Sequence, residues 1–372
     1  MNARTIFRFD ASRLGDLLDG IAERGYRLLG PVAREGAVVY DELGGADDLP
    51  RGWRDHQDPG RYRLERSDRN LFFEFNMGPH GWKKYLLPAE EPLWRALWRG
   101  EEMLFEETNV DDGKRAFIGV RACELAALAM LDRVFGEGDF RDDRYLARRA
   151  NLFIVAVNCT RAGRTCFCTS MDTGPEARSG FDLVLTEVAH GGAHFFQVAA
   201  GTTRGDALLD ALAFEEASPA DRNLAKRLLD EAARSMGRHL NTGGLPERLA
   251  GSGEHPHWQR IAARCLACAN CTMVCPTCFC NTVVDRPALD GRSAERIRCW
   301  DSCFSADFSY LHGGSIRQST GSRYRQWMTH KLSSWVDQFG ASGCVGCGRC
   351  IAWCPVGIDI TEEAERIGEE LS

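Results

Sequence analysis

The first 250 or so residues carry the two hydrophobic periods that distinguish helices from strands. Apolar residues recur at helical spacing in three segments, which predicts amphipathic helices at 11–24, 124–135 and 221–236. Short alternating or continuous apolar runs predict strands at 1–10, 26–29, 37–40, 62–65, 71–75, 116–120, 152–157, 182–188 and 194–199. Strands interleaved with helices in this way predict an α/β or α+β fold.

Composition indicates an ordinary globular protein and argues against two classes of partner. Of the 372 residues, 44% are hydrophobic and 27% are charged. The longest apolar run, at 152–157, is too short to cross a bilayer, so we expect no membrane insertion. A net charge of −7 argues against a basic surface for nucleic acid.

The first ten residues lack a secretory pattern, so the 16 cysteines predict a protein of the reducing cytoplasm.

Eight of the cysteines form two runs of identical spacing near the C-terminus. Each run reads C-x2-C-x2-C-x3-C-P, the spacing of bacterial ferredoxins. In that arrangement the first three thiolates of a run hold one [4Fe–4S] cluster, and the fourth reaches the other cluster. The first cluster is therefore assigned to Cys265, Cys268, Cys271 and Cys354. The second is assigned to Cys344, Cys347, Cys350 and Cys275.

Zinc and disulfide bonds fit these runs less well than iron–sulfur clusters do. A zinc ribbon separates two C-x2-C pairs by about 15 to 20 residues, whereas four cysteines here fall within one short segment. A disulfide framework would need an oxidising compartment. Cluster ligation is therefore the prediction for both runs.

The chain is expected to form two domains. A glycine- and proline-rich stretch after Met236 is typical of a linker or a covering loop, so we place the boundary there. Residues 1–250 would form the α/β domain, and residues 251–372 an α-helical, ferredoxin-like dicluster domain. The long gap between Cys275 and Cys344 predicts an inserted subdomain at about 281–340.

The remaining cysteines fall into two groups of four, each containing the string Thr-Cys-Phe-Cys, at 165–168 and 277–280. In the first group, Cys123 begins a predicted helix whose dipole favours thiolate. Cys159 follows a buried strand, at an edge that often holds ligands. We predict that a third [4Fe–4S] cluster lies in the N-terminal domain and is bound by Cys123, Cys159, Cys166 and Cys168. The alternative is that these four are scattered core cysteines.

The second group leaves more alternatives open. Its members are Cys278, Cys280, Cys299 and Cys303. They would complete a fourth cluster, but small cysteines beside a cluster also serve as core filler, and a redox-active set is a further alternative. The chain shows no glycine-rich nucleotide fingerprint, and no residue is assigned a catalytic role.

Two basic features allow more than one interpretation. The segment 315–331 has no acidic residue but contains Arg317, Arg323, Arg325, His330 and Lys331. It predicts a solvated face, a local balance to cluster charge, or a docking surface for an acidic partner. His255 and His257 are expected on the linker surface, because the cysteines already suffice as ligands.

Several short strings, taken in order, resemble one family of redox subunits. They are Gly119-Val120-Arg121-Ala122-Cys123-Glu124-Leu125, Asn158-Cys159, Cys166-Phe167-Cys168 with Gly174-Pro175, Cys275 to Cys280, Trp300-Asp301-Ser302-Cys303, and Cys344 to Cys350. Over about 115–360 the chain resembles the iron–sulfur β subunit of cytoplasmic NAD(P)-linked [NiFe] hydrogenases, the sulfhydrogenases. It is also similar to the equivalent iron–sulfur subunit of anaerobic sulfite reductase. Cys299 stands outside the family pattern.

The resemblance implies an electron-transfer subunit of a multi-subunit complex. In such complexes a separate flavin-containing subunit, with FAD, exchanges hydride with NAD(P)H as a diaphorase. The β subunit passes single electrons to the small subunit of a [NiFe] hydrogenase or, in the other enzyme, to a sulfite reductase subunit. We expect the hydrogenase role here. A stand-alone iron–sulfur enzyme that reduces a disulfide or sulfur substrate is the alternative of a different class.

Overall fold

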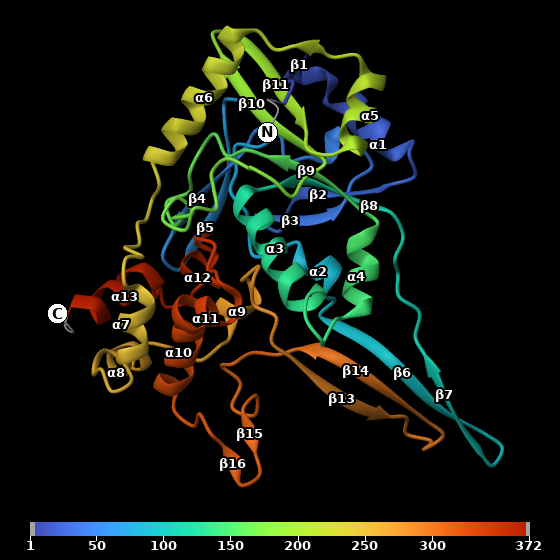
Figure 1. Ribbon diagram of the computed structural model, residues 1–372, viewed down its shortest axis with the longest axis vertical. Coiled ribbons are helices and arrows are strands. Elements are labelled where there is room, and N and C mark those ends of the chain that lie inside the picture. The colour runs from blue at the N-terminus through green and yellow to red at the C-terminus, as the bar shows by residue number, and fades with distance from the viewer. Residues whose placement is uncertain (1–3, 370–372) are drawn as a thin grey trace.

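A mixed eight-stranded sheet organises the N-terminal part within residues 4–369, which the computed structural model describes (Figure 1). The strand order is β12-β1-β11-β10-β9-β8-β2-β3. The bounds are β1 (Phe7–Asp10), β2 (Arg27–Arg34), β3 (Ala37–Glu42), β8 (Arg115–Val120), β9 (Leu152–Val157), β10 (Leu183–His190), β11 (Ala193–Ala200) and β12 (Glu215–Glu216). The strands β10, β9, β8 and β2 run parallel. Every residue of β8 and β9 is buried, as expected for parallel strands covered on both faces.

Helices cover both faces of this sheet. α1 and α5 lie on one side, and α3 and α4 lie on the other (Figure 1). The bounds are α1 (Leu14–Ala22), α2 (Lys83–Leu86), α3 (Ala122–Gly136), α4 (Asp143–Ala150), α5 (Thr203–Leu212) and α6 (Pro219–Arg234), with short 3-10 turns at Ala11–Arg13 and Ala46–Asp48. The predicted helices correspond to α1, α3 and α6, and the predicted α/β class is confirmed. Part of the predicted first strand, at residues 1–3, lies outside the described residues.

One predicted strand is wrong. Residues 71–75 are buried but form no strand, because side chains satisfy their backbone. The buried carboxylate of Glu187 accepts hydrogen bonds from the amides of Phe72 and Phe73 at 2.7 and 2.8 Å. The Arg121 guanidinium donates to two carbonyls of the segment at 3.0 and 2.8 Å. With these partners supplied, the segment needs no neighbouring strand.

Short helices build the C-terminal part around a second hydrophobic core. They are α7 (Leu245–Gly251), α8 (His257–Ala262), α9 (Asn270–Met273), α10 (Thr320–Thr329), α11 (Trp335–Phe339), α12 (Arg349–Ala352) and α13 (Ile360–Glu369). A π-helical turn, His330–Ser334, joins α10 to α11. The glycine- and proline-rich stretch is not a plain linker, because α7 buries Leu245 and Leu249. The expected surface position of His255 and His257 is also wrong. Both are buried, and His257 pairs with Glu363 at 2.5 Å.

A second sheet, four-stranded in the described part of the chain, combines strands from both halves of the sequence. Its order is β13-β14-β6-β7, with bounds β6 (Glu90–Arg99), β7 (Glu102–Glu107), β13 (Asn281–Pro287) and β14 (Ser293–Trp300). It projects from the body of the molecule, as does the small hairpin of β15 (Tyr310–Leu311) and β16 (Gly314–Ser315) (Figure 1). A further hairpin consists of β4 (Trp53–Asp58) and β5 (Arg61–Arg66). Among the strands of the predicted insertion, β14 therefore pairs with β6 from the N-terminal part.

Glu91 anchors the projecting sheet to the body. Its buried carboxylate accepts a hydrogen bond from Arg144 at 2.7 Å and others from Arg148 and Arg298. Burial alone would raise the pKa of Glu91, but the three guanidinium groups lower it to about 2. The ionised carboxylate thus ties β6 to α4 and β14 at neutral pH.

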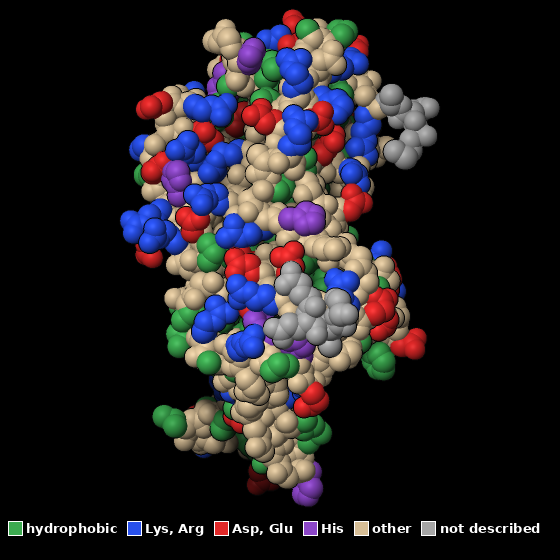
Figure 2. Space-filling model, turned by 90° about the vertical axis from the view of Figure 1, so that its left-hand side faces the viewer, with side chains coloured by type: hydrophobic (Ala, Val, Ile, Leu, Met, Phe, Trp, Pro, Cys, Tyr) green, Lys and Arg blue, Asp and Glu red, His purple; other side chains and the backbone are tan. Residues whose placement is uncertain are grey.

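The surface mixes both signs of charge. Figure 2 shows basic and acidic side chains intermingled over the upper part of one face, with apolar side chains on its narrow lower part. Several large apolar side chains are exposed on the projecting hairpins, among them Trp98, Phe105, Tyr310 and Leu311. None of the helices in the described residues combines the length and apolar character that a bilayer crossing requires.

Candidate metal centres

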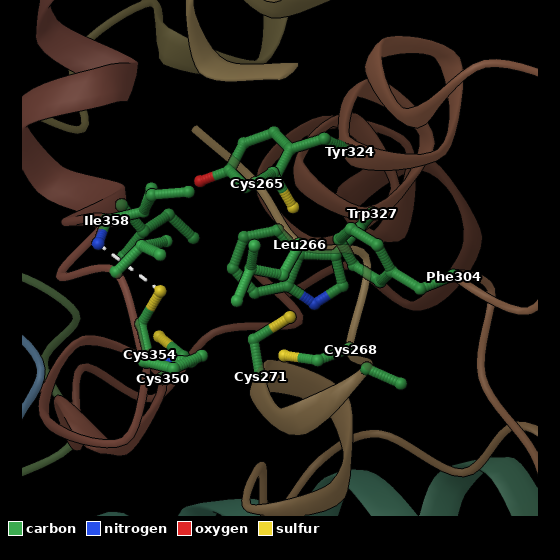
Figure 3. A pocket seen from close by; sticks show the side chains of 14 residues that line it. Cys265, Leu266, Cys268, Cys271, Phe304, Tyr324, Trp327, Cys350, Cys354 and Ile358 are labelled. Carbon is green, nitrogen blue, oxygen red and sulfur yellow. Dashed lines mark hydrogen bonds between the residues drawn. The ribbon is translucent and has the colours of Figure 1, made fainter. Parts of the chain in front are cut away.

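Both cysteine runs project into one cavity, which we call site 1 after its four predicted ligands Cys265, Cys268, Cys271 and Cys354. Figure 3 shows the first three sulfurs on one side of the cavity and that of Cys354 on the other. The aromatic rings of Phe304, Tyr324 and Trp327 also line the cavity, as does Cys350 of the second run. The cavity therefore brings Cys354 of the second run to three cysteines of the first, and the crossed ligation of a cluster by these four stays a prediction.

Backbone amides donate hydrogen bonds to the sulfurs of two site 1 cysteines. The amide of Ala267 donates to Cys265 Sγ at 3.4 Å, and the amide of Ile358 donates to Cys354 Sγ at 3.3 Å (Figure 3). Such hydrogen bonds favour the charged form of a sulfur ligand. The cavity thus offers the sulfurs some of the stabilisation that a bound cluster requires.

Site 2 lies beside site 1 and consists of Cys275, Cys344, Cys347 and Cys350. Burial raises the pKa of Cys350, and the neighbouring thiolates of Cys344, Cys347 and Cys275 raise it further. Burial likewise raises the pKa of Cys344 to about 12. Negative charge on these sulfurs therefore disfavours the thiolate form of Cys350. A metal bound here would have to displace their protons.

Lys331 places a buried positive charge at site 2. Its ammonium donates to Cys275 Sγ at 3.3 Å, to Thr277 Oγ1 at 2.9 Å and to the carbonyl of Gly343 at 3.0 Å. Burial opposes the charge, but the thiolates of Cys275 and Cys278 raise the pKa of Lys331 well above its ordinary value. The basic segment 315–331 allowed three interpretations: a solvated face, a local balance to cluster charge, and a docking surface. The buried position of Lys331 beside Cys275 fits the second of these.

Site 3 consists of the third predicted set, Cys123, Cys159, Cys166 and Cys168, which line one cavity. Cys123 lies in the first turn of α3, after β8, and Cys159 follows β9. Because β8 and β9 are parallel, their carboxyl ends meet at the same edge of the sheet. The sheet therefore brings together cysteines from distant parts of the sequence. Cys347 of site 2 also lines this cavity.

Burial outweighs the helix dipole at site 3. Burial raises the pKa of Cys123 well above its ordinary value, and negative charge at Cys347 and Cys168 raises it further. Burial and the Cys159 thiolate raise the pKa of Cys166 to about 12. The expected effect of the dipole on Cys123 does not prevail, because desolvation of the buried thiolate costs more than one helix terminus offers.

Three arginines border site 3, and sequence reasoning missed them: Arg121, Arg161 and Arg349. Arg121 donates to Cys159 Sγ at 3.8 Å. Arg349 is 2% exposed and donates from Nη2 to Glu124 at 2.7 Å. Within residues 4–369, its Nε and Nη1 have no hydrogen-bond partner. Unused buried donors beside four thiols fit an anionic group in the cavity. The available signal was adjacency in sequence, since Arg349 directly precedes Cys350.

The backbone segments that carry the cysteines of sites 2 and 3 are in direct contact. The amide of Phe167 donates to the carbonyl of Gly346 at 2.8 Å, and Cys166 Sγ lies 3.9 Å from the carbonyl oxygen of Cys347. Gly348 has φ of +72°, and a Cβ atom there would lie 2.1 Å from the carbonyl oxygen of Thr165. Only glycine permits this approach. The segment that carries two site 3 cysteines therefore packs directly on the loop of site 2.

The last group of cysteines is brought together only in part. Cys278, Cys280 and Cys303, which we call site 4, line one cavity together with side chains of α10, α11 and the π-helical turn. Cys299 does not line it. It lies on β14 opposite Thr282 of β13, and its Sγ is 3.9 Å from Arg286 Nη2.

The geometry fits clusters better than single ions. Among the described residues, no three His, Cys, Asp or Glu side chains converge closely enough to hold one metal ion. A tetrahedral zinc ion would draw its sulfurs to within about 4 Å of one another, whereas a [4Fe–4S] core separates its thiolates more widely. The lining residues of sites 1 and 3 border about 430 and 420 Å³ of space, open solvent included. Space and all-thiolate donor sets thus fit [4Fe–4S] clusters.

Comparisons with known proteins agree with this chemistry. The 4Fe-4S dicluster domain family matches residues 264–358. Over 270 residues the chain is 32% identical to the sulfhydrogenase 2 subunit beta of Pyrococcus furiosus, covering 72% of this chain and 78% of that protein. Identity of this level over most of both chains, together with the dicluster match, shows common descent. The chain therefore belongs to the family of iron–sulfur β subunits of sulfhydrogenases.

Proposed function

We propose that this chain relays single electrons through [4Fe–4S] clusters between a [NiFe] hydrogenase module and a flavin-containing, NAD(P)H-linked subunit. The observation that carries the proposal is the direct contact between sites 2 and 3, where Phe167 and Gly346 share a hydrogen bond of 2.8 Å. A bound [4Fe–4S] cluster supplies a one-electron carrier whose potential depends on its surroundings. A relay requires such carriers to be neighbours, and this contact would make them so.

Site 2 occupies the middle of the proposed path. Its ligand Cys350 also lines the cavity of site 1, and its ligand Cys347 also lines the cavity of site 3. The ligand sets therefore follow one another from site 1 through site 2 to site 3. This succession supports electron passage between the C-terminal and N-terminal parts of the molecule.

The surrounding residues would act on the carriers rather than on a substrate. Tyr324 and Trp327 place apolar surface against site 1, which limits water there. Lys331 and Arg349 offset negative charge at sites 2 and 3. In this proposal FAD and NAD(P) are bound by the flavin subunit, and the hydrogenase module handles protons and H2. No catalytic residue is therefore assigned to this chain.

The test uses the intact complex, purified without oxygen from its native host with its co-purifying subunits identified. We expect iron and acid-labile sulfide sufficient for several clusters on this chain. Either H2 or NAD(P)H should generate the electron paramagnetic resonance (EPR) signals of reduced clusters. Cys166→Ser, which removes a site 3 ligand, should slow H2-dependent reduction of NAD(P)+ by an order of magnitude or more.

Cys299→Ser is the matched control, because Cys299 lines none of the cavities at sites 1, 3 and 4. It should retain the activity. If H2 does not reduce the clusters but sulfite reoxidises them, the chain would instead be assigned to an anaerobic sulfite reductase. Disulfide reduction by the isolated chain with a chemical reductant would make it a stand-alone reductase and overturn the relay.

A further inference from the structure

We propose that site 4 holds a further iron–sulfur cluster, bound by Cys278, Cys280 and Cys303, with His330 and not Cys299 as its fourth ligand. The inference rests on the proposed relay function and extends it by one carrier. It also replaces the fourth set expected from the sequence, because the structure separates Cys299 from the other three cysteines.

The repeated Thr-Cys-Phe-Cys string provides the first argument. At site 3, Cys166 and Cys168 line a cavity while Thr165 is fully buried, its hydroxyl donating to Gln57 Oε1 at 2.7 Å. At site 4, Cys278 and Cys280 line a cavity while Thr277 is fully buried, its hydroxyl donating to the carbonyl of Gly343 at 2.7 Å. The same string therefore combines a buried threonine anchor with a pair of thiols facing open space in both places.

The two phenylalanines of the repeat also have matching roles. Phe167 belongs to the N-terminal part of the sequence, but its ring is fully buried in the C-terminal core. Phe279 belongs to the C-terminal part, and its ring packs edge-on against that of Phe135 in α3, with the ring centroids 5.6 Å apart. The Phe279 ring also packs against that of Trp335, at a centroid distance of 5.5 Å. Each ring fixes its string against the other half of the molecule. Packing that fixes the backbone of the string also fixes the direction of its thiols.

The cavity at site 4 has the size and chemistry for a cluster. The space that its lining residues border, open solvent included, is about 930 Å³, against about 430 Å³ at site 1. Cys303 comes from the loop after β14, so the third thiol that lines the cavity belongs to a different segment from the Cys278 and Cys280 pair. Three thiols around such a space leave room for a cluster and for one further ligand.

His330 is the side chain best suited to complete the set. The other basic groups that line the cavity are Arg317 and Lys331. An arginine cannot deprotonate to bind a metal, and Lys331 is already held by Cys275, Thr277 and Gly343. A neutral imidazole is a common iron ligand. Partly buried His330 therefore remains as the ligand.

The backbone and surroundings of His330 support this role. The residue begins the π-helical turn His330–Ser334, and π-helical turns occur frequently at functional sites. The ring of His330 lies 5.2 Å from that of Trp335, which also lines the cavity. Packing against Trp335 restricts the orientation of the imidazole. Cys299, in contrast, lies in a strand ladder beside Arg286, outside the cavity.

Site 4 also has a place in the path. Lys331, whose ammonium donates to Cys275 Sγ of site 2 at 3.3 Å, also lines the cavity of site 4, so a cluster at site 4 would adjoin the central carrier. Phe308 and Asn281, which line the cavity, lie at the bases of the two projecting hairpins. A carrier at site 4 would thus connect site 2 with the projecting end of the molecule.

The first experiment compares Cys303→Ser with Cys299→Ser in the complex purified without oxygen. Cys303→Ser should lower the iron and the sulfide of the chain by about four atoms each, the content of one [4Fe–4S] cluster. Cys299→Ser should leave both unchanged. EPR signals retained from sites 1 and 2 would show that the Cys303 variant has folded.

The second experiment tests the fourth ligand. His330→Cys should retain the cluster but shift its reduction potential downward, because imidazole ligation raises the potential relative to thiolate. His330→Ala should change the EPR signal of that cluster and leave the signals of sites 1 and 2 intact. An unchanged potential in His330→Cys would remove His330 from the ligand set.

The outcomes separate this inference from the relay itself. Equal iron loss in Cys299→Ser and Cys303→Ser would identify Cys299 as the ligand. Unchanged iron in Cys303→Ser would leave site 4 without a cluster while the relay through sites 1 to 3 stands. A wild-type chain that holds no iron–sulfur cluster would overturn the proposed function as well.

Discussion

At the scale of single residues, buried cations accompany the thiols of this molecule. Lys331 contacts Cys275 of site 2, and Arg349 lines site 3 and has two nitrogens, Nε and Nη1, without a partner among the described residues. A buried cation is costly unless a negative group compensates it. Glu124 pairs with Arg349 at 2.7 Å, and the thiolates of bound clusters would add further compensation at both cations. These two residues should therefore influence potential more than any residue at the surface.

Lys331→Gln tests this influence at site 2. Loss of a charged hydrogen bond to Cys275 should lower the reduction potential of the cluster held by Cys275, because the reduced state carries more negative charge. A change of about 60 mV corresponds to a tenfold change in a one-electron equilibrium and is the size expected for one such bond. EPR-monitored redox titration measures it.

Lys226→Gln is the control for Lys331→Gln. Lys226 is exposed on α6 and pairs only with Asp230, at 2.8 Å, among the partners described. Its replacement should leave every cluster potential unchanged. If both variants shift the potentials equally, net charge rather than the contact at Cys275 is responsible.

The grouping of cysteines could be predicted from the sequence, whereas the cations could not. Ligand spacing along one short segment restricts which sulfurs can meet, so the assignment of sites 1 and 2 follows from positions such as Cys265 and Cys268. The assignment of site 3 followed instead from Cys159 at the end of a predicted strand and Cys123 at the start of a predicted helix. Whether these sites contain metal stays a prediction. The partner of Lys331 depends on where the π-helical turn packs in three dimensions, and nothing in the local pattern specifies that.

At the scale of elements, strong periodicity was reliable where burial alone decides the structure. The predicted strand at 152–157 coincides with β9, which is buried on both faces. The prediction failed at 71–75, where Glu187 and Arg121 replace strand partners. An apolar run indicates that a segment is buried, but it does not indicate which groups form hydrogen bonds with the amides and carbonyls of that segment.

Glu91 makes the attachment of β6 dependent on pH. Its pKa is about 2 when folded, against 4.5 ordinarily. The stability that it contributes is therefore fully present above pH 4.5 and is lost as the pH falls toward 2. Glu91→Gln should cost about 3 kcal/mol at pH 7, because three arginines lose their partner. Guanidinium unfolding followed by circular dichroism should show this difference shrinking below pH 4.5.

The neighbouring residue provides the control for Glu91→Gln. Glu90 also pairs with an arginine, Arg286, at 2.7 Å, but its side chain is exposed. Exposed pairs are screened by solvent, so Glu90→Gln should change the free energy of unfolding little at any pH. Equal effects of the two substitutions would refute the special role of Glu91.

At the scale of the whole molecule, the two halves are interlocked. Phe167 enters the C-terminal core and Phe279 packs on α3, while the Arg349–Glu124 ion pair of 2.7 Å crosses between them in a buried position. Such contacts join residues far apart in the sequence. Hydrophobic period and ligand spacing are local signals, so they could predict the two parts but not the way the parts fit together.

Gly348→Ala tests the contact between the halves. The new Cβ would lie 2.1 Å from the carbonyl oxygen of Thr165, so the loops of sites 2 and 3 must separate. We expect a loss of about 3 kcal/mol in the free energy of unfolding. The magnetic interaction between the two clusters, measured by EPR on the reduced protein, should weaken.

Gly291→Ala isolates the effect of backbone strain. Gly291 has φ of +67°, close to the +72° of Gly348, but a Cβ there meets nothing within 4 Å. Its replacement should cost about 1 kcal/mol, from strain alone, and leave the EPR spectrum unchanged. A spectrum altered equally in both variants would contradict a direct contact between sites 2 and 3.

The shared sheet of β6, β7, β13 and β14 limits how this protein can be divided. β14 hydrogen-bonds to β6, although the two strands come from opposite sides of the position near residue 250. A fragment beginning at residue 251 would present β14 with one edge unpaired, which invites aggregation. The ferredoxin-type segment therefore cannot be treated as an independent unit. A chimera that places it in another redox enzyme would have to include β6 and β7 as well.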